Sequence, residues 1–133
     1  MQGVLADTGP LYAAVDPDDR YHARAQEQLR TLEDENRSVI LAYPTLLEAY
    51  TLILHRLGGP TAARWVDDIR AGTASLNPTT EDYLAALGLV KRFPDQTITL
   101  FDATVAALAM RLSLPVWTYD HHFDTMRSSV WRA

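Results

Sequence analysis

The sequence predicts an α/β fold in which a parallel sheet is covered by helices on both faces. Short apolar runs at residues 4–6, 38–42 and 115–119 alternate with longer segments of helical pattern. The run at 38–42 is almost continuously apolar, which is typical of a strand buried on both sides of a parallel sheet. Strands and helices that alternate in this way favour parallel pairing through right-handed crossovers.

Local signals place each element along the chain. After the first strand at residues 4–6, we expect residues 8–10 to form a tight turn and a short helix to begin near Leu11, with Pro10 in its first turn. Further helices are expected at residues 20–36, 44–57, 60–70, 83–93, 101–112 and 122–126. Further strands are expected at residues 38–42, 74–76 and 115–119, with a short last one at 130–131.

Two of these helices have informative apolar faces. In the helix at residues 60–70, Ala63, Val66 and Ile69 lie on one side. The helix at residues 101–112 is apolar almost all round, and we therefore expect it to lie inside the protein.

Composition indicates one cytoplasmic domain spanning residues 1–133. A chain of 133 residues can bury one substantial core and is too short for two ordinary domains. No apolar run approaches the ~18 residues of a membrane span, and the first residues lack the pattern of a signal peptide. The absence of cysteine excludes disulfides and thiolate metal sites. A net charge of −5 argues against bulk electrostatic coating of nucleic acid, but not against a nucleic-acid enzyme.

Two carboxylates follow predicted strands: Asp7 after the first and Asp120 after the fourth. Active sites of open parallel sheets lie beyond the carboxyl ends of the strands, so these side chains converge if the two strands are neighbours. Each residue taken singly can equally be a turn-forming or helix-capping aspartate.

Two further carboxylates lie near the starts of predicted helices. Glu48 is one turn into an apolar helix, where a charge near the helix N-terminus is the alternative to a functional role. Asp102 begins the nearly all-apolar helix, where it can be an N-cap, a metal ligand, or both. A cluster of four carboxylates and no thiolate suits Mg²⁺ or Mn²⁺, and such ions promote phosphodiester hydrolysis by activating water and stabilising the leaving oxygen.

Several short motifs together resemble the signature of the PIN-domain family, in particular its VapC-type toxin ribonucleases. These motifs are Asp7-Thr8-Gly9, Glu48, Phe101-Asp102-Ala103 and residues 118–123, Thr-Tyr-Asp-His-His-Phe. The resemblance covers the chain in order and at the usual length of the family.

The resemblance implies a three-layer α/β/α sandwich with a four- or five-stranded parallel sheet. It also implies a Mg²⁺- or Mn²⁺-dependent endoribonuclease, a homodimer, and a cognate antitoxin that blocks the site. Asp7, Asp102 and Asp120 would hold one or two ions, and Glu48 would bind the second ion or orient the attacking water, leaving a 5′-phosphate and a 3′-hydroxyl. Thr8 and Thr118 match hydroxyl positions near the site.

Other residues carry weaker assignments. Asp124, one helical turn after Asp120, is a candidate additional carboxylate. Candidate RNA-backbone ligands are Arg20, Arg56 and Arg92. We expect His121 and His122 to be ordinary loop residues, one packed and one exposed. Of the three tryptophans that could stack on bases, Trp117 should lie in the core, whereas Trp65 is a candidate for a dimer or partner surface.

Two alternative functions remain open. The first is a PIN-like binding module without catalysis. The second is phosphoryl transfer through an aspartyl phosphate at Asp7. For this second function a haloacid-dehalogenase-like site would need a second aspartate where Gly9 stands, and a receiver-like domain would need a late lysine, but the only lysine is Lys91 on a predicted helix.

Overall fold

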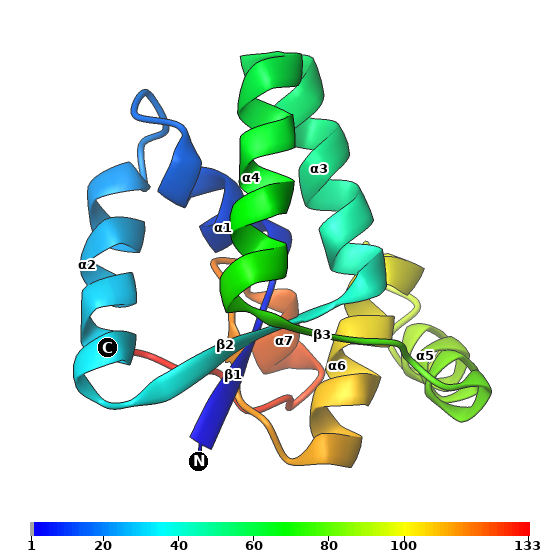
Figure 1. The fold of residues 1–133 in the computed structure, drawn as a ribbon. Helices are drawn as coiled ribbons and strands as arrows, with labels where there is room; N and C mark the ends of the chain where they lie inside the picture. The colour runs from blue at the N-terminus through cyan, green and yellow to red at the C-terminus, as the bar shows by residue number, and fades with distance from the viewer. Residues whose placement is uncertain (1) are drawn as a thin grey trace.

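The computed structural model describes residues 2–133, in which four parallel strands form one sheet between two layers of helices (Figure 1). The strands are β1 (Gln2–Ala6), β2 (Arg37–Ala42), β3 (Ala74–Leu76) and β4 (Val116–Trp117). The helices are α1 (Thr8–Val15), α2 (His22–Asp34), α3 (Tyr43–Leu57), α4 (Gly59–Gly72), α5 (Thr80–Arg92), α6 (Leu100–Leu112) and α7 (His122–Thr125). The order across the sheet is β3-β2-β1-β4, and every pairing is parallel, which confirms the predicted fold class.

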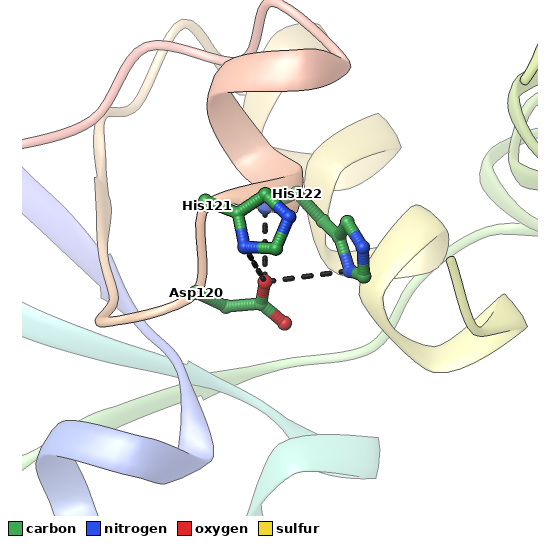
Figure 2. Close-up of side chains that lie close together, drawn as sticks. All are labelled: Asp120, His121 and His122. Carbon is green, nitrogen blue, oxygen red and sulfur yellow. Dashed lines mark hydrogen bonds and ion pairs between the residues drawn. The ribbon is translucent and has the colours of Figure 1, made fainter. Parts of the chain in front are cut away.

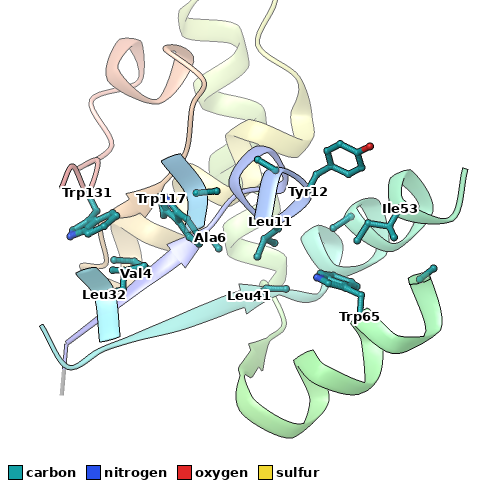
Figure 3. Close-up of a cluster of buried hydrophobic side chains, with 14 residues drawn as sticks. Val4, Ala6, Leu11, Tyr12, Leu32, Leu41, Ile53, Trp65, Trp117 and Trp131 are labelled. Carbon is teal, nitrogen blue, oxygen red and sulfur yellow. The ribbon is translucent and has the colours of Figure 1, made fainter. Parts of the chain in front are cut away.

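Alternate residues of β1, β2 and β4 contribute to two separate cores. Val4 and Ala6 of β1 join Leu41 and Trp117 in a core shared with α1, α2, α3 and α4 (Figure 3). Leu5, between them, belongs to the opposite core, which is formed with α5, α6 and α7. Because both faces of the sheet are covered, its strands carry continuous apolar runs instead of the alternation of a half-exposed sheet.

The start of the chain differs from the predicted turn. Helix α1 begins at Thr8, directly after Asp7, so residues 8–10 form its first turn. Pro10 is tolerated there because the first amides of a helix have no intrahelical partner to lose. The predicted fourth strand is shorter than expected, and Val130 makes a single parallel bridge to Val116 instead of a strand.

Helix α4 faces the core with Ala62 and Trp65, and Val66 and Ile69 of the apolar side noted from the sequence also pack against this core. Ala62 and Trp65 are buried, whereas Ala63 is exposed. The proposal that Trp65 forms a partner surface is therefore wrong. Trp117 lies in the core as predicted, and Trp131 is also buried against it, with ring centroids 6.4 Å apart. None of the three tryptophans is free to stack on a base.

Within residues 2–133, no helix combines the length and the apolar character that crossing a membrane requires.

Two aliphatic residues of α3 provide a test of this packing. Ile53 is fully buried and Leu47 is 64% exposed. Ile53→Ala should lower the free energy of unfolding by about 2–5 kcal/mol, because it leaves a cavity in the core. Leu47→Ala, the matched control, should change it by less than about 0.5 kcal/mol. Urea unfolding measures both, and equal losses would contradict the assigned face of α3.

Candidate active site

The sheet order brings the carboxyl ends of β1 and β4 side by side. The amide of Asp7 donates to the carbonyl of Trp117 at 2.9 Å, which extends the ladder one residue beyond β1. The hydroxyl of Thr118 then donates to Oδ2 of Asp7 at 2.8 Å. Asp7 occupies the N-cap position of α1, as one alternative predicted, but its side chain makes no capping hydrogen bond to the helix.

Thr118 also connects Asp7 to Asp120. Its hydroxyl oxygen accepts a hydrogen bond from the amide of Asp120 at 3.0 Å while it donates to Asp7. Oδ1 of Asp120 in turn accepts from the amide of His122 at 2.9 Å. One hydroxyl therefore acts as both donor and acceptor, and it holds two aspartates at the same edge of the sheet.

Asp102 lies in the first turn of α6 and is not its N-cap. Thr99 caps this helix, and its hydroxyl accepts from the amide of Asp102 at 3.0 Å. Helix α6 is in turn fixed to α5 by Arg111, whose guanidinium binds both oxygens of Asp82 at 2.8 and 2.9 Å. The carboxylate of Asp102 is thus left free of capping and is carried by a helix with a defined position.

The four predicted carboxylates line one cleft of about 440 Å³. Glu48 reaches it from α3 and is exposed, whereas Asp7 is 6% exposed. Thr8 also lines the cleft, and its buried hydroxyl has no hydrogen-bond partner among residues 2–133. The complete lining is Asp7, Thr8, Gly9, Glu48, Asp102, Tyr119, Asp120 and His121.

Burial and mutual repulsion raise the pKa values of two of these carboxyl groups. Burial raises the pKa of Asp7 to about 6, with smaller contributions from Asp120 and Glu48, although the hydrogen bond from Thr118 opposes the shift. Burial, followed by the charges of Asp7 and Asp120, raises the pKa of Asp102 to about 7. Negative charge in the cleft is therefore under-compensated by the protein, which is the condition that favours binding of a cation.

Two histidines adjoin this cleft beside Asp120 (Figure 2). Nδ1 of His122 lies 3.3 Å and Nδ1 of His121 3.9 Å from Oδ1 of Asp120. The side chain of His121 is 77% exposed and that of His122 is 12% exposed, as predicted for one exposed and one packed residue. The ligand atoms of these three residues lie within 4.8 Å of one another, a spacing that a metal ion could bridge.

Some predicted residues are not brought to this cleft. Asp124 forms an ion pair with Arg132 at 2.7 Å and does not line the cleft. Arg20 and Arg56 lie over tyrosine rings, and Arg92 ends α5, so none of the three lines it either. Tyr119, which does line it, was not singled out from the sequence, although its position between Thr118 and Asp120 was the available signal.

Comparisons with known proteins agree with this architecture. A family model for the PIN domain matches residues 4–128. A search of curated proteins found no match.

Solved structures resemble the chain over most of its length. VapC20 of Mycobacterium tuberculosis, a sarcin–ricin loop cleaving toxin, shares 20% identity at a TM-score of 0.84 and covers 98% of this chain and 99% of its own. VapBC2 of Rickettsia felis, solved with a DNA fragment from its promoter, shares 11% identity at a TM-score of 0.78 and covers 98% of both chains. A toxin–antitoxin complex of Klebsiella pneumoniae shares 17% identity at a TM-score of 0.66 and covers 89% of this chain and 87% of its own. At these low identities, the TM-scores indicate a shared fold.

Replacement of Asp7 should make the protein more stable at neutral pH when divalent cations are removed. The pKa of about 6 in the folded protein lies above the ordinary value of 3.8. Stability that depends on the protonated carboxyl group is complete below pH ~4 and is lost as the pH rises through ~6. Asp7→Asn stays neutral, so its free energy of unfolding in EDTA should exceed that of the parent by on the order of 1–3 kcal/mol near pH 7.5.

Urea unfolding at several pH values measures this difference, which should approach zero near pH 4. Asp95→Asn is the matched control, because Asp95 is exposed and lies outside the cleft. A gain for Asp7→Asn that is equally large at pH 4 and pH 7.5 would contradict the assignment, since it could not come from the charge.

Proposed function

The chain belongs to the PIN-domain family, and from this premise we propose that it is a metal-dependent endoribonuclease. The convergence of Asp7, Glu48, Asp102 and Asp120 on one cleft is the observation that carries the proposal. Asp7 and Asp120 follow β1 and β4, and Glu48 and Asp102 lie in α3 and α6. The pKa values of Asp7 and Asp102 are raised in the absence of a cation. The likeness in fold to a sarcin–ricin loop cleaving toxin adds support.

The donor set of the cleft fits Mg²⁺ or Mn²⁺. Its four carboxylates offer oxygen ligands of the kind that hard cations prefer, and no cysteine competes for a softer metal. Asp7, Asp102 and Asp120 would hold one or two ions, with Glu48 as a further ligand. When bound, the ion supplies Lewis acidity for phosphodiester hydrolysis.

The chain's own residues then have separate tasks in hydrolysis. Thr118 fixes the orientation of Asp7 and the backbone of Asp120, so both carboxylates are placed before substrate arrives. Glu48 is exposed at the cleft and is available to orient the attacking water. Attack on phosphorus breaks the bond to the 3′ oxygen, which leaves a 3′-hydroxyl and a 5′-phosphate.

The proposal extends to the biological setting: a cytoplasmic toxin, blocked by a cognate antitoxin and active as a homodimer. The similarity in fold between this chain and a toxin–antitoxin complex supports the antitoxin as a partner. A second copy of the chain is supported by α5, which exposes Tyr83, Leu84 and Leu87 within little more than one turn. An exposed apolar group of this kind indicates a surface that another protein covers.

Cleavage of RNA tests the proposed activity. The purified chain should cut single-stranded RNA in Mg²⁺ or Mn²⁺, and EDTA should stop the reaction. Asp7→Asn and Asp120→Asn should each lower the rate on the order of 10³-fold, because each removes a charge that holds the cation. Asp95→Asn, outside the cleft, should leave the rate unchanged. Full cleavage by Asp7→Asn would contradict the mechanism, whereas a parent chain that never cuts RNA would favour the non-catalytic binding module.

Substitution on α5 tests the homodimer. Leu84 is 61% exposed. Its replacement by glutamate should destabilise the dimer, because a charge would be buried at the interface. Light scattering should show Leu84→Glu as a monomer at concentrations where the parent is a dimer. Leu47→Glu, at a position 64% exposed on α3, is the matched control and should remain dimeric. Loss of the dimer in both variants would count against α5 as the interface.

A further inference from the structure

A second, smaller cleft adjoins the four carboxylates. Its volume is about 210 Å³, and it shares Tyr119, Asp120 and His121 with the acidic cleft. The residues that it adds include two arginines, Arg24 from α2 and Arg132 near the C-terminus. An extended ligand that occupies the acidic cleft therefore meets cationic side chains as it continues past Tyr119.

Arg24 is held in place by aromatic rings. Its guanidinium carbon lies 4.9 Å from the ring centre of Tyr119 and 6.0 Å from that of Tyr21. The two rings contact each other with centres 4.9 Å apart. Contacts of this kind contribute about 0.5–1 kcal/mol at exposed sites, and they limit the positions that a long side chain can occupy.

This support is tied to the core through a buried glutamine. The hydroxyl of Tyr119 donates to Oε1 of Gln28 at 2.6 Å, and the indole N–H of Trp117 donates to the same oxygen at 2.9 Å. Tyr119 also lies between Thr118 and Asp120 in the chain, so it is fixed by the same segment that places Asp7 and Asp120. The guanidinium of Arg24 is consequently positioned relative to the carboxylates.

Arg24 carries an uncompensated charge. It forms no ion pair with any carboxylate in residues 2–133, whereas Arg132 in the same cleft is paired with Asp124. The guanidinium of Arg24 thus lies without a carboxylate partner in a cleft that shares Asp120 with the acidic cleft. Its planar array of N–H donors matches a phosphate group.

We propose that Arg24, positioned by Tyr21 and Tyr119, binds an RNA backbone phosphate next to the scissile phosphodiester. This inference rests on the proposed ribonuclease function and extends it to the path of the substrate. Tyr21 contacts the ring of Tyr119, and Arg24 lies over that ring, so the ring of Tyr119 positions the cation. A phosphate contact orients the strand without reading its sequence. Arg24 lines the cleft that adjoins the carboxylates, whereas Arg20, Arg56 and Arg92 line neither cleft, and it therefore replaces them as the backbone ligand.

RNA binding can be measured apart from cleavage. In an Asp7→Asn background with Mg²⁺, fluorescence anisotropy of a labelled single-stranded RNA should show that Arg24→Gln raises Kd about tenfold at low salt. The slope of log K against log salt concentration should become shallower by about 0.7, the value for one lost phosphate contact on a single strand. Arg24→Lys should keep the slope and recover part of the affinity, because it retains the charge but not the planar donors.

Arg30→Gln is the matched control. Arg30 is also an exposed arginine of α2, and six residues further along it points about 240° around the helix from Arg24. Its replacement should change Kd by less than about twofold and leave the salt slope unchanged. With Asp7 restored, Arg24→Gln should raise KM for RNA while kcat stays within about threefold of the parent.

An Arg24→Gln variant that binds RNA with the affinity and salt slope of the parent would overturn the inference, even if the parent cleaves RNA. Equal weakening by Arg24→Gln and Arg30→Gln would also overturn it, because it would reflect overall charge and not a site. Failure of the parent to cleave RNA in Mg²⁺ or Mn²⁺ would defeat the proposed function in a separate assay, while the binding comparison would still decide the role of Arg24.

Discussion

The contact between the ends of β1 and β4 determines where the acidic cleft lies. The chain adds β2 and β3 on one side of β1 and then crosses to place β4 on the other. At such a switch point the loops that leave neighbouring strands diverge, so a crevice forms between them. Asp7 and Thr118 leave these strands in register, and one hydroxyl then connects Asp7 to Asp120. Glu48 and Asp102 only have to reach a place that these two strands already define.

A buried carboxyl group at this place costs the protein stability. Asp7 is 6% exposed, and the hydrogen bond from Thr118 does not prevent a rise in its pKa. Asp102 is affected in the same direction, partly by Asp7 itself. Helices on both faces supply large cores, including seven consecutive buried residues of α6 from 103 to 109, and this packing can sustain a locally unfavourable cluster. Unfavourable charge in an otherwise consistent fold is a sign of a site that needs a ligand.

Much of this arrangement could be predicted from the sequence, because local patterns decide it. The four strands were predicted from apolar runs, and Asp7 and Asp120 follow two of them. Glu48 and Asp102 were predicted from their positions near the starts of apolar helices. Features that depend on tertiary contacts were not. Neighbouring alanines at positions 62 and 63 leave the rotation of α4 open, so Trp65 could not be assigned to the core. Similarly, the polar Gln28 gives no local sign that it is buried, yet it accepts hydrogen bonds from Trp117 and Tyr119.

An acidic protein that acts on RNA must attract its substrate locally while its net charge repels it at a distance. Salt screens the long-range repulsion within about 10 Å at 0.1 M, whereas contacts at the site are less affected. A cation among the carboxylates removes the local repulsion only where it binds. The RNA phosphates on either side of the bound cation still need a hydrogen-bond donor. Tyr119 positions Arg24 as such a donor within the adjoining cleft. Specific placement of a few charges, and not a generally basic surface, is therefore how a chain with a net charge of −5 can hold a polyanion.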